Sequence, residues 1–76
     1  MKITYQTTDF LICTTLLYFS HELKEIDRSN PSRCIFGILK KKETEEILND
    51  FFNNKILVEP KRFFAIQKEL KQRLYN

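Results

Sequence analysis

Few side chains in this sequence are placed to catalyse a reaction or to hold a metal ion. His21 is the only histidine, and its place beside Glu22 is typical of a solvated residue at the start of a strand. The glutamates within residues 43–46 resemble a metal-binding cluster, but acidic residues at a predicted helix start complement the helix dipole. Neither Cys13 nor Cys34 has a predicted base nearby, and a sequence with one glycine lacks a phosphate-binding loop. We therefore predict a protein that is not an enzyme and that uses no cofactor or metal.

The closing segment, residues 60–76, combines cations with aromatic side chains at helical spacing. A narrow apolar stripe predicts the core-facing side of a helix and consists of Phe63, Ile66, Leu70 and Leu74. A neighbouring flank mixes lysines with aromatic residues and consists of Lys61, Phe64, Lys68, Lys71 and Tyr75. Lysines bind phosphates and exposed rings stack on bases, so this flank fits a nucleic-acid surface. Alternatively, Phe64 and Tyr75 widen the core stripe and the lysines only edge it.

Charge is segregated along the chain, although the net charge is only +3. Residues 21–42 carry a net charge of +3, residues 43–59 carry −4, and residues 60–76 carry +4. Such segregation creates local fields that the net value hides. The side chains that we predict to contact a nucleic-acid backbone are Arg28, Arg33, Lys40, Lys41, Lys42, Lys61, Lys68, Lys71 and Arg73, with Phe64 and Tyr75 as stacking or contact residues.

Two binding functions fit this pattern. The leading hypothesis is a small non-enzymatic module that binds the phosphate backbone of nucleic acid with little base specificity. The alternative is a protein-interaction accessory of a phage or other mobile element, in which an edge strand, the hairpin or the Phe64–Tyr75 flank meets a protein partner or a second copy. Pairing of the predicted acidic helix with the lysines of the closing helix would favour the alternative.

The elements that must position these residues predict an α+β fold. Alternation of apolar and polar residues over 1–6 predicts a short N-terminal strand. Residues 22–28 and 33–40 flank a Ser-Asn-Pro-Ser turn, which predicts a β-hairpin over residues 22–40. The sheet is therefore expected to be small and antiparallel. The second arm, 34–39, is apolar on both faces and predicts a central strand covered on both sides. Within it, Gly37 indicates a bulge or a close packing contact.

Three helices are predicted to pack with this sheet, beginning near Asp9, Thr44 and Pro60. Thr8 and Thr44 are the expected N-caps, and Pro60 fits the first position of its helix. Residues 55–58 are apolar enough for one more short strand. The side chains predicted to be most buried are Phe36, Ile38, Ile47, Phe51, Phe63, Ile66 and Leu70, with Leu48 and Phe52 on the buried side of the second helix.

The length of 76 residues predicts a single domain spanning residues 1–76. The apolar run from Phe10 to Phe19 is too short to cross a bilayer, which takes about 20 residues in helical form, so no membrane association is expected. Cys13 and Cys34 lie within apolar runs and form no Cys-x-x-Cys pair. Both are therefore predicted to be reduced core residues in a cytoplasmic protein.

Three stretches carry a resemblance to a known family: TTDFLICTTLLYF, IFGILK and ILVEPKRFFAIQKELKQRLYN. They are similar to the small bacterial and phage-associated family DUF5659, whose members resemble one another in an early helix, a Phe-rich strand and a closing helix that follows a Pro-Lys pair. The resemblance covers nearly the whole chain and implies no activity. This sequence departs from the family at Thr14 and Thr15, where a small alanine is usual, and at Glu59, where an aspartate cap is typical.

Overall fold

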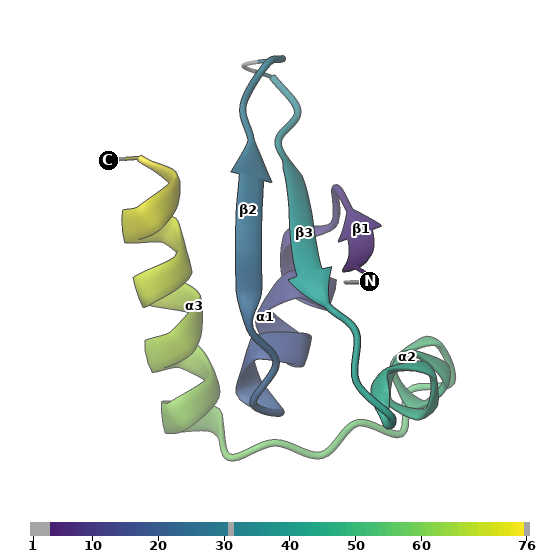
Figure 1. The fold of residues 1–76 in the computed structure, drawn as a ribbon. Helices are drawn as coiled ribbons and strands as arrows, with labels where there is room; N and C mark the ends of the chain where they lie inside the picture. Colours follow the sequence, from purple (N-terminus) through teal and green to yellow (C-terminus); the bar gives the residue numbers. More distant parts are fainter. Residues whose placement is uncertain (1–3, 31, 76) are drawn as a thin grey trace.

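Residues 4–30 and 32–75 are described by the computed structural model, and in these segments the chain forms one three-stranded antiparallel sheet and three helices (Figure 1). The α+β fold predicted from the sequence is therefore confirmed. In chain order the elements are β1 (Thr4–Thr7), α1 (Phe10–Tyr18), β2 (Leu23–Asp27), β3 (Ile35–Leu39), α2 (Thr44–Phe52) and α3 (Pro60–Leu74).

The sheet has the order β1-β3-β2, so β3 is the central strand as predicted. Leu23 pairs with Ile38 and Glu25 pairs with Gly37, which leaves one extra residue of β2 in a bulge opposite Gly37. The bulge places both Leu23 and Ile26 toward the core although they are three residues apart. A β-carbon at position 37 would lie 2.8 Å from Cγ of Glu25, so a larger residue here would require the Glu25 side chain to move.

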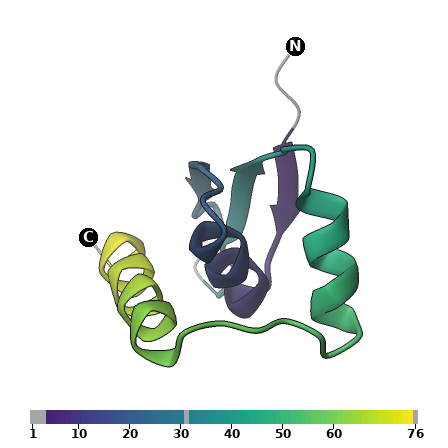
Figure 2. The ribbon, with the colours of Figure 1, turned by 90° about the horizontal axis from the view of Figure 1, so that it is seen from below.

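Helices cover only one face of the sheet. In Figures 1 and 2, α1 lies over this face, with α3 on one side of it and α2 on the other. Phe36 and Ile38 point into the core here, so Gly37 faces the opposite side. Within the described chain no helix lies over that opposite face, where the side chain of Glu25 approaches Gly37. The expectation that β3 is covered on both sides is wrong.

The core is built around α1. Ile12, Cys13 and Leu16 of this helix are buried against Phe36 and Ile38 of the sheet, together with Leu70 of α3 and Ile47 of α2. Thr14 and Thr15 are buried as well, and their hydroxyls donate to the carbonyls of residues 10 and 11, one turn earlier. Burial raises the pKa of the Cys13 thiol to about 12. Cys34 is also a free thiol but is only half-buried.

Helix caps differ from two of the predictions. Asp9, and not Thr8, caps α1, because its carboxylate accepts hydrogen bonds from the backbone N–H groups of residues 11 and 12. Thr44 is the first residue of α2 and its hydroxyl makes no cap bond within the helix. The carboxylate of Glu59 caps α3 by accepting hydrogen bonds from the backbone N–H groups of residues 61 and 62. Pro60 occupies the first helical turn, as predicted.

Several predicted positions in the second half of the chain are more exposed than expected. Residues 55–59 form no strand; they connect α2 to α3 and pass beneath α1 in the view of Figure 2. Phe52 is 64% exposed, and Phe51, Phe63 and Ile66 are only partly buried. Of the core residues predicted in α2 and α3, Ile47 and Leu70 are buried, as predicted.

Candidate nucleic-acid interface

The lysines and aromatic rings on one flank of α3 are exposed. We call this surface the lysine flank, and it consists of Lys61, Phe64, Lys68, Lys71 and Tyr75. Phe64 is 63% exposed and Tyr75 is 82% exposed, so neither ring widens the core stripe. The three lysines are also exposed, whereas Leu70 on the opposite side of the helix is 1% exposed. The flank is therefore an exposed surface and not a widened core stripe.

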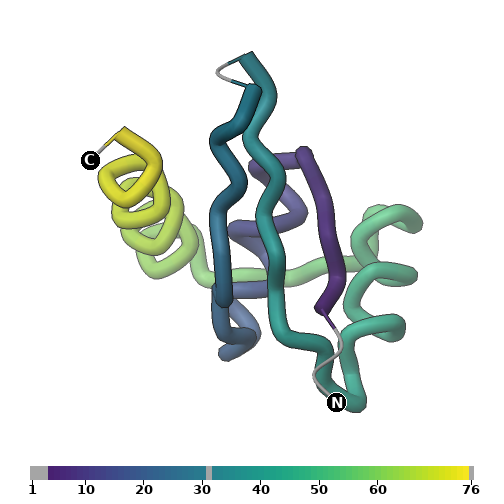
Figure 3. Tube along the Cα trace, turned by 45° about the horizontal axis from the view of Figure 1, so that its top comes forward, coloured from purple at the N-terminus to yellow at the C-terminus, as the bar shows by residue number. Residues whose placement is uncertain are grey.

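The hairpin tip lies beside the C-terminal end of α3. Figures 1 and 3 show α3 running alongside β2, with its end directed toward the tip. Nη2 of Arg28 donates a hydrogen bond to the backbone carbonyl of Arg73, which joins the tip to the last turn of the helix. The carboxylate of Asp27 accepts from the backbone N–H and hydroxyl of Ser29, and these bonds lower its pKa from the usual value. The tip is therefore held in place beside the helix.

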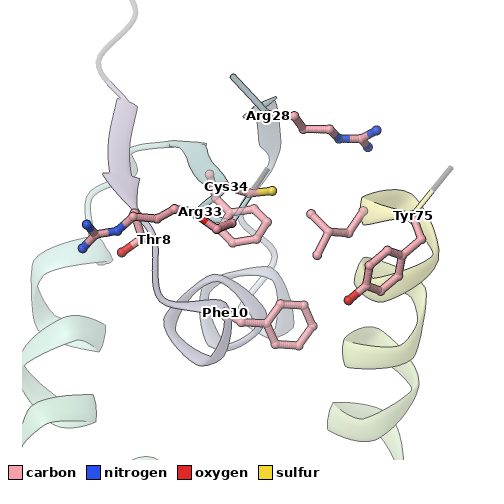
Figure 4. A pocket seen from close by; sticks show the side chains of 9 residues that line it. Thr8, Phe10, Arg28, Arg33, Cys34 and Tyr75 are labelled. Atoms are coloured by element: carbon pink, nitrogen blue, oxygen red, sulfur yellow. The ribbon is translucent and has the colours of Figure 1, made fainter. Parts of the chain in front are cut away.

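A cleft of about 540 Å³ separates the hairpin tip from the end of α3 (Figure 4). The residues around it come from three elements and include Phe10, Arg28, Arg33, Cys34, Leu74 and Tyr75. In Figure 4 the ring of Tyr75 points across the opening toward Phe10, and the two arginine side chains extend to opposite sides of it. The cleft thus has apolar and aromatic walls, and Arg28 and Arg33 line it on the hairpin side.

Tyr75 lies at the junction of this cleft and the lysine flank. It lines the cleft and also a second, shallower hollow that it shares with Lys68, Lys71 and Gln72. Nζ of Lys71 lies 5.9 Å from the centroid of the Phe10 ring, so the same lysine contacts a wall of the cleft. Tyr75 therefore connects the C-terminal end of the lysine flank to the cleft at the hairpin tip.

The whole chain matches one family: residues 2–76 match the domain of unknown function DUF5659. The chain belongs to the DUF5659 family. No curated protein and no solved structure shows significant similarity to it. The two departures from the family pattern are accommodated in the fold, since the hydroxyls of Thr14 and Thr15 bond within α1 and Glu59 caps α3.

The other predicted cations of this DUF5659 domain lie elsewhere. Residues 40–42 follow β3 at the end of the sheet opposite the hairpin tip (Figure 1). Nζ of Lys41 donates to the carbonyl of Ser20 and lies 3.9 Å from a carboxylate oxygen of Glu43. Lys61 is at the first turn of α3, at the end of the helix away from the tip. The structure therefore brings Lys68 and Lys71 near the cleft that Arg28 and Arg33 line. The side chain of Arg73 lies on the other flank of α3, in a hollow that it shares with Glu22 and Glu69. Residues 40–42 and Lys61 lie apart from this end of the helix.

The acidic helix does not pack against the lysine flank. Figure 2 shows α1 between α2 and α3, and Glu45 and Glu46 lie in the first turn of α2. The ion pairs identified within residues 4–30 and 32–75, Lys24–Glu22 and Lys41–Glu43, join neighbouring parts of the chain and not α2 to α3. Charge segregation along the sequence is thus also segregation in space.

His21 is buried, in contrast to the solvated position predicted for it. Its Nε2 atom lies 2.8 Å from Oγ1 of Thr44, and its Nδ1 atom lies 3.2 Å from the carbonyl of Phe19. The side chain thus joins the end of α1 to the start of α2 and is enclosed by protein. Within the part of the chain that the structure describes, no three His, Cys, Asp or Glu side chains are grouped for a metal ion, and no helix has the length and apolar content of a membrane span.

Proposed function

We propose that this DUF5659 domain is a non-enzymatic module that binds the phosphate backbone of nucleic acid through the lysine flank and the hairpin tip. One observation carries the proposal: Tyr75 joins the hollow at Lys68 and Lys71 to the cleft that Arg28 and Arg33 line, so these cations lie around one opening. The acidic residues in the first turn of α2 lie on the far side of α1, away from Lys68 and Lys71.

Backbone binding has a measurable signature, because each phosphate neutralised by a cation releases condensed counterions. The logarithm of affinity falls by about 0.7 per logarithm of salt for each contact on single strands and by about 0.9 on duplex DNA. Arg33, Lys68 and Lys71 are exposed around the cleft and the hollow beside it. If each meets one phosphate, the expected slope is about −2 to −3.

The test measures fluorescence anisotropy of labelled oligonucleotides between about 50 and 200 mM salt. Replacing Lys68 and Lys71 with Gln should flatten the slope by about 1–2 units. The matched control replaces Lys40 and Lys42, which removes the same charge at the other end of the sheet. Equal flattening by both pairs, or no binding by the unchanged protein, would overturn the proposal.

A second candidate function, docking of a protein partner, is favoured by apolar side chains away from the basic surface. Leu57 is 89% exposed on the connection between α2 and α3, and Phe52 is 64% exposed at the end of α2. Exposed large apolar residues are common at interfaces with other proteins. A partner chain of a mobile element or a second copy would bury them. Light scattering of the purified protein, with Leu57→Ser as the comparison, tests for a second copy.

Both functions belong to an intracellular setting, and the proposal places the protein in the cytoplasm. Cys13 and Cys34 are both free thiols, as is usual where glutathione keeps cysteines reduced.

A further inference from the structure

The cleft at the hairpin tip is more than backbone binding requires. A phosphate needs cations on an open surface, and the lysine flank already provides them. The cleft instead has a volume of about 540 Å³, which lies within the range of pockets that enclose organic ligands. Its walls include Phe10, Phe36, Cys34 and Leu74, and the rings of Phe10 and Phe36 pack edge to face with centroids 6.3 Å apart. Such walls suit a flat, apolar group.

The mouth of the cleft presents an aromatic ring that the fold does not use. Tyr75 follows the last residue of α3 and is 82% exposed, so core packing does not account for its position. Its ring points across the opening toward Phe10 (Figure 4). Lys71 lies over the Phe10 ring on one side, and Arg33 is exposed on the hairpin side. An exposed aromatic ring beside cations is the arrangement that binds a base together with a neighbouring phosphate.

We propose that the cleft receives one unpaired base of a nucleic-acid strand whose backbone lies on the lysine flank. This inference rests on the proposed function. The base stacks on the ring of Tyr75, and Lys68 and Lys71 hold the neighbouring phosphates. Bases inside a duplex are stacked and paired and cannot enter a pocket without being extruded. The domain therefore binds single strands in preference to duplexes, and with little dependence on base identity, because every base offers a flat face.

Hydrogen bonds within the protein join and shape the parts of the chain around the cleft. Nη2 of Arg28 donates to the carbonyl of Arg73 and so joins the hairpin tip to the end of α3. On the hairpin, Asn30 accepts from the backbone N–H and hydroxyl of Ser32, which shapes the turn beside the opening. A site formed before binding loses less conformational entropy when a base enters.

The first test compares a single strand of about 12 nucleotides with a duplex of the same length and sequence at one salt concentration. The unchanged protein should bind the single strand more tightly. Tyr75→Ala should weaken single-strand binding by about 5- to 150-fold, the range expected for loss of one base–aromatic stack, and should change duplex binding by less than about twofold. Tyr75→Phe keeps the ring and should retain single-strand affinity. The slope against salt should stay the same in all three proteins.

The outcomes separate this inference from the proposed function. If neither oligonucleotide binds, the proposed function fails and the inference fails with it. If both bind equally, or if Tyr75→Ala weakens both alike, backbone binding stands and the base site is overturned. Preference for the duplex would also overturn it.

The second test uses Cys34 as a reporter in the unsubstituted protein. Cys34 lines the cleft, whereas Cys13 is fully buried with a pKa of about 12, so an alkylating reagent at about pH 8 should modify Cys34 alone. A saturating single strand should slow the alkylation, measured by intact mass, by about tenfold or more, the factor that 90% occupancy of the cleft implies. A duplex should not slow it. Cys34→Ser identifies the modified thiol, and alkylation that continues unchanged with the single strand bound would show that the base does not enter the cleft.

Discussion

The Nε2 atom of His21 lies 2.8 Å from the Oγ1 atom of Thr44, and this bond joins two segments separated by 23 residues. The carbonyl of Phe19 can only accept, so Nδ1 of His21 donates to it, and in the neutral ring Nε2 then accepts from the Thr44 hydroxyl. The oxygen of Thr44 accepts in turn from the backbone N–H of Lys41. Each polar atom of this buried group therefore has a partner, and α2 is anchored to the turn after α1.

Replacing Thr44 with Val should destabilise the fold by about 1–3 kcal/mol, because Nε2 of His21 is then buried without a partner. Urea unfolding followed by circular dichroism measures the change. Thr44→Ser is the matched control, since it keeps the hydroxyl and loses only a methyl group. Equal stability of the Val and Ser variants would mean that the hydrogen bond contributes nothing.

Leu70 should be the residue through which α3 is held to the core. It is 1% exposed, and truncation to Ala should lower the free energy of unfolding by about 2–5 kcal/mol, as for other buried leucines. Phe64→Ala removes a larger side chain from the exposed side of the same helix and should change stability by less than about 0.5 kcal/mol. Similar losses in the two variants would show that α3 packs through a different face.

Gly37→Ala should destabilise the sheet because the new β-carbon would lie 2.8 Å from Cγ of Glu25. The expected cost is about 1–3 kcal/mol, typical of overpacking. Glu25→Ala removes Cγ and should relieve most of this cost, so the two substitutions together should be less harmful than their sum by about 0.5–3 kcal/mol. A double-mutant cycle measures this coupling, and simple additivity would show that the bulge adjusts without the glutamate.

Local patterns in the sequence predict most of the fold. Period-two alternation and the turn around residues 29–32 locate the hairpin, and Pro60 locates the start of α3, because each depends on backbone preferences of a few residues. The prediction that Thr44 caps α2 was wrong, because it also depended on local pattern alone. A threonine before a glutamate-rich stretch resembles an N-cap, and only the packed fold brings His21 close enough to use its hydroxyl.

The candidate site was predicted in part. Exposure of the lysine flank follows from the helical period of α3, since Leu70 and Leu74 define the buried side. The separation of residues 40–42 from the hairpin tip could also have been predicted from the sequence. Lys40 follows Arg33 by seven positions, and in an extended strand this is a span of roughly 23 Å, which places the two residues at opposite ends of the strand. The cleft was not predictable, because its walls come from the start of α1, the hairpin and the end of α3, and their meeting depends on how α3 docks.

Cys13 makes stability sensitive to alkaline pH. Its thiol has an ordinary value of 9.0, and burial raises its pKa in the folded protein to about 12, although the charge of Arg73 acts in the opposite direction. Between these two values the unfolded chain has released the proton while the folded chain retains it, so the free energy of unfolding falls as pH rises. Below about pH 9 both states keep the proton and this group contributes no pH dependence.

We therefore expect the free energy of unfolding to fall above about pH 9 by up to about 1.4 kcal/mol per pH unit through Cys13 alone. Urea unfolding at several pH values measures the slope. Cys13→Ala lowers the free energy of unfolding at every pH by leaving a small cavity. Its free energy of unfolding should fall less steeply with pH than that of the unchanged protein, by the slope that corresponds to about one proton. Cys34→Ala is the control with the same chemical change at a half-buried thiol. If the Cys13 and Cys34 variants show the same slope, ionisation of the buried thiol is not what weakens the fold in alkali.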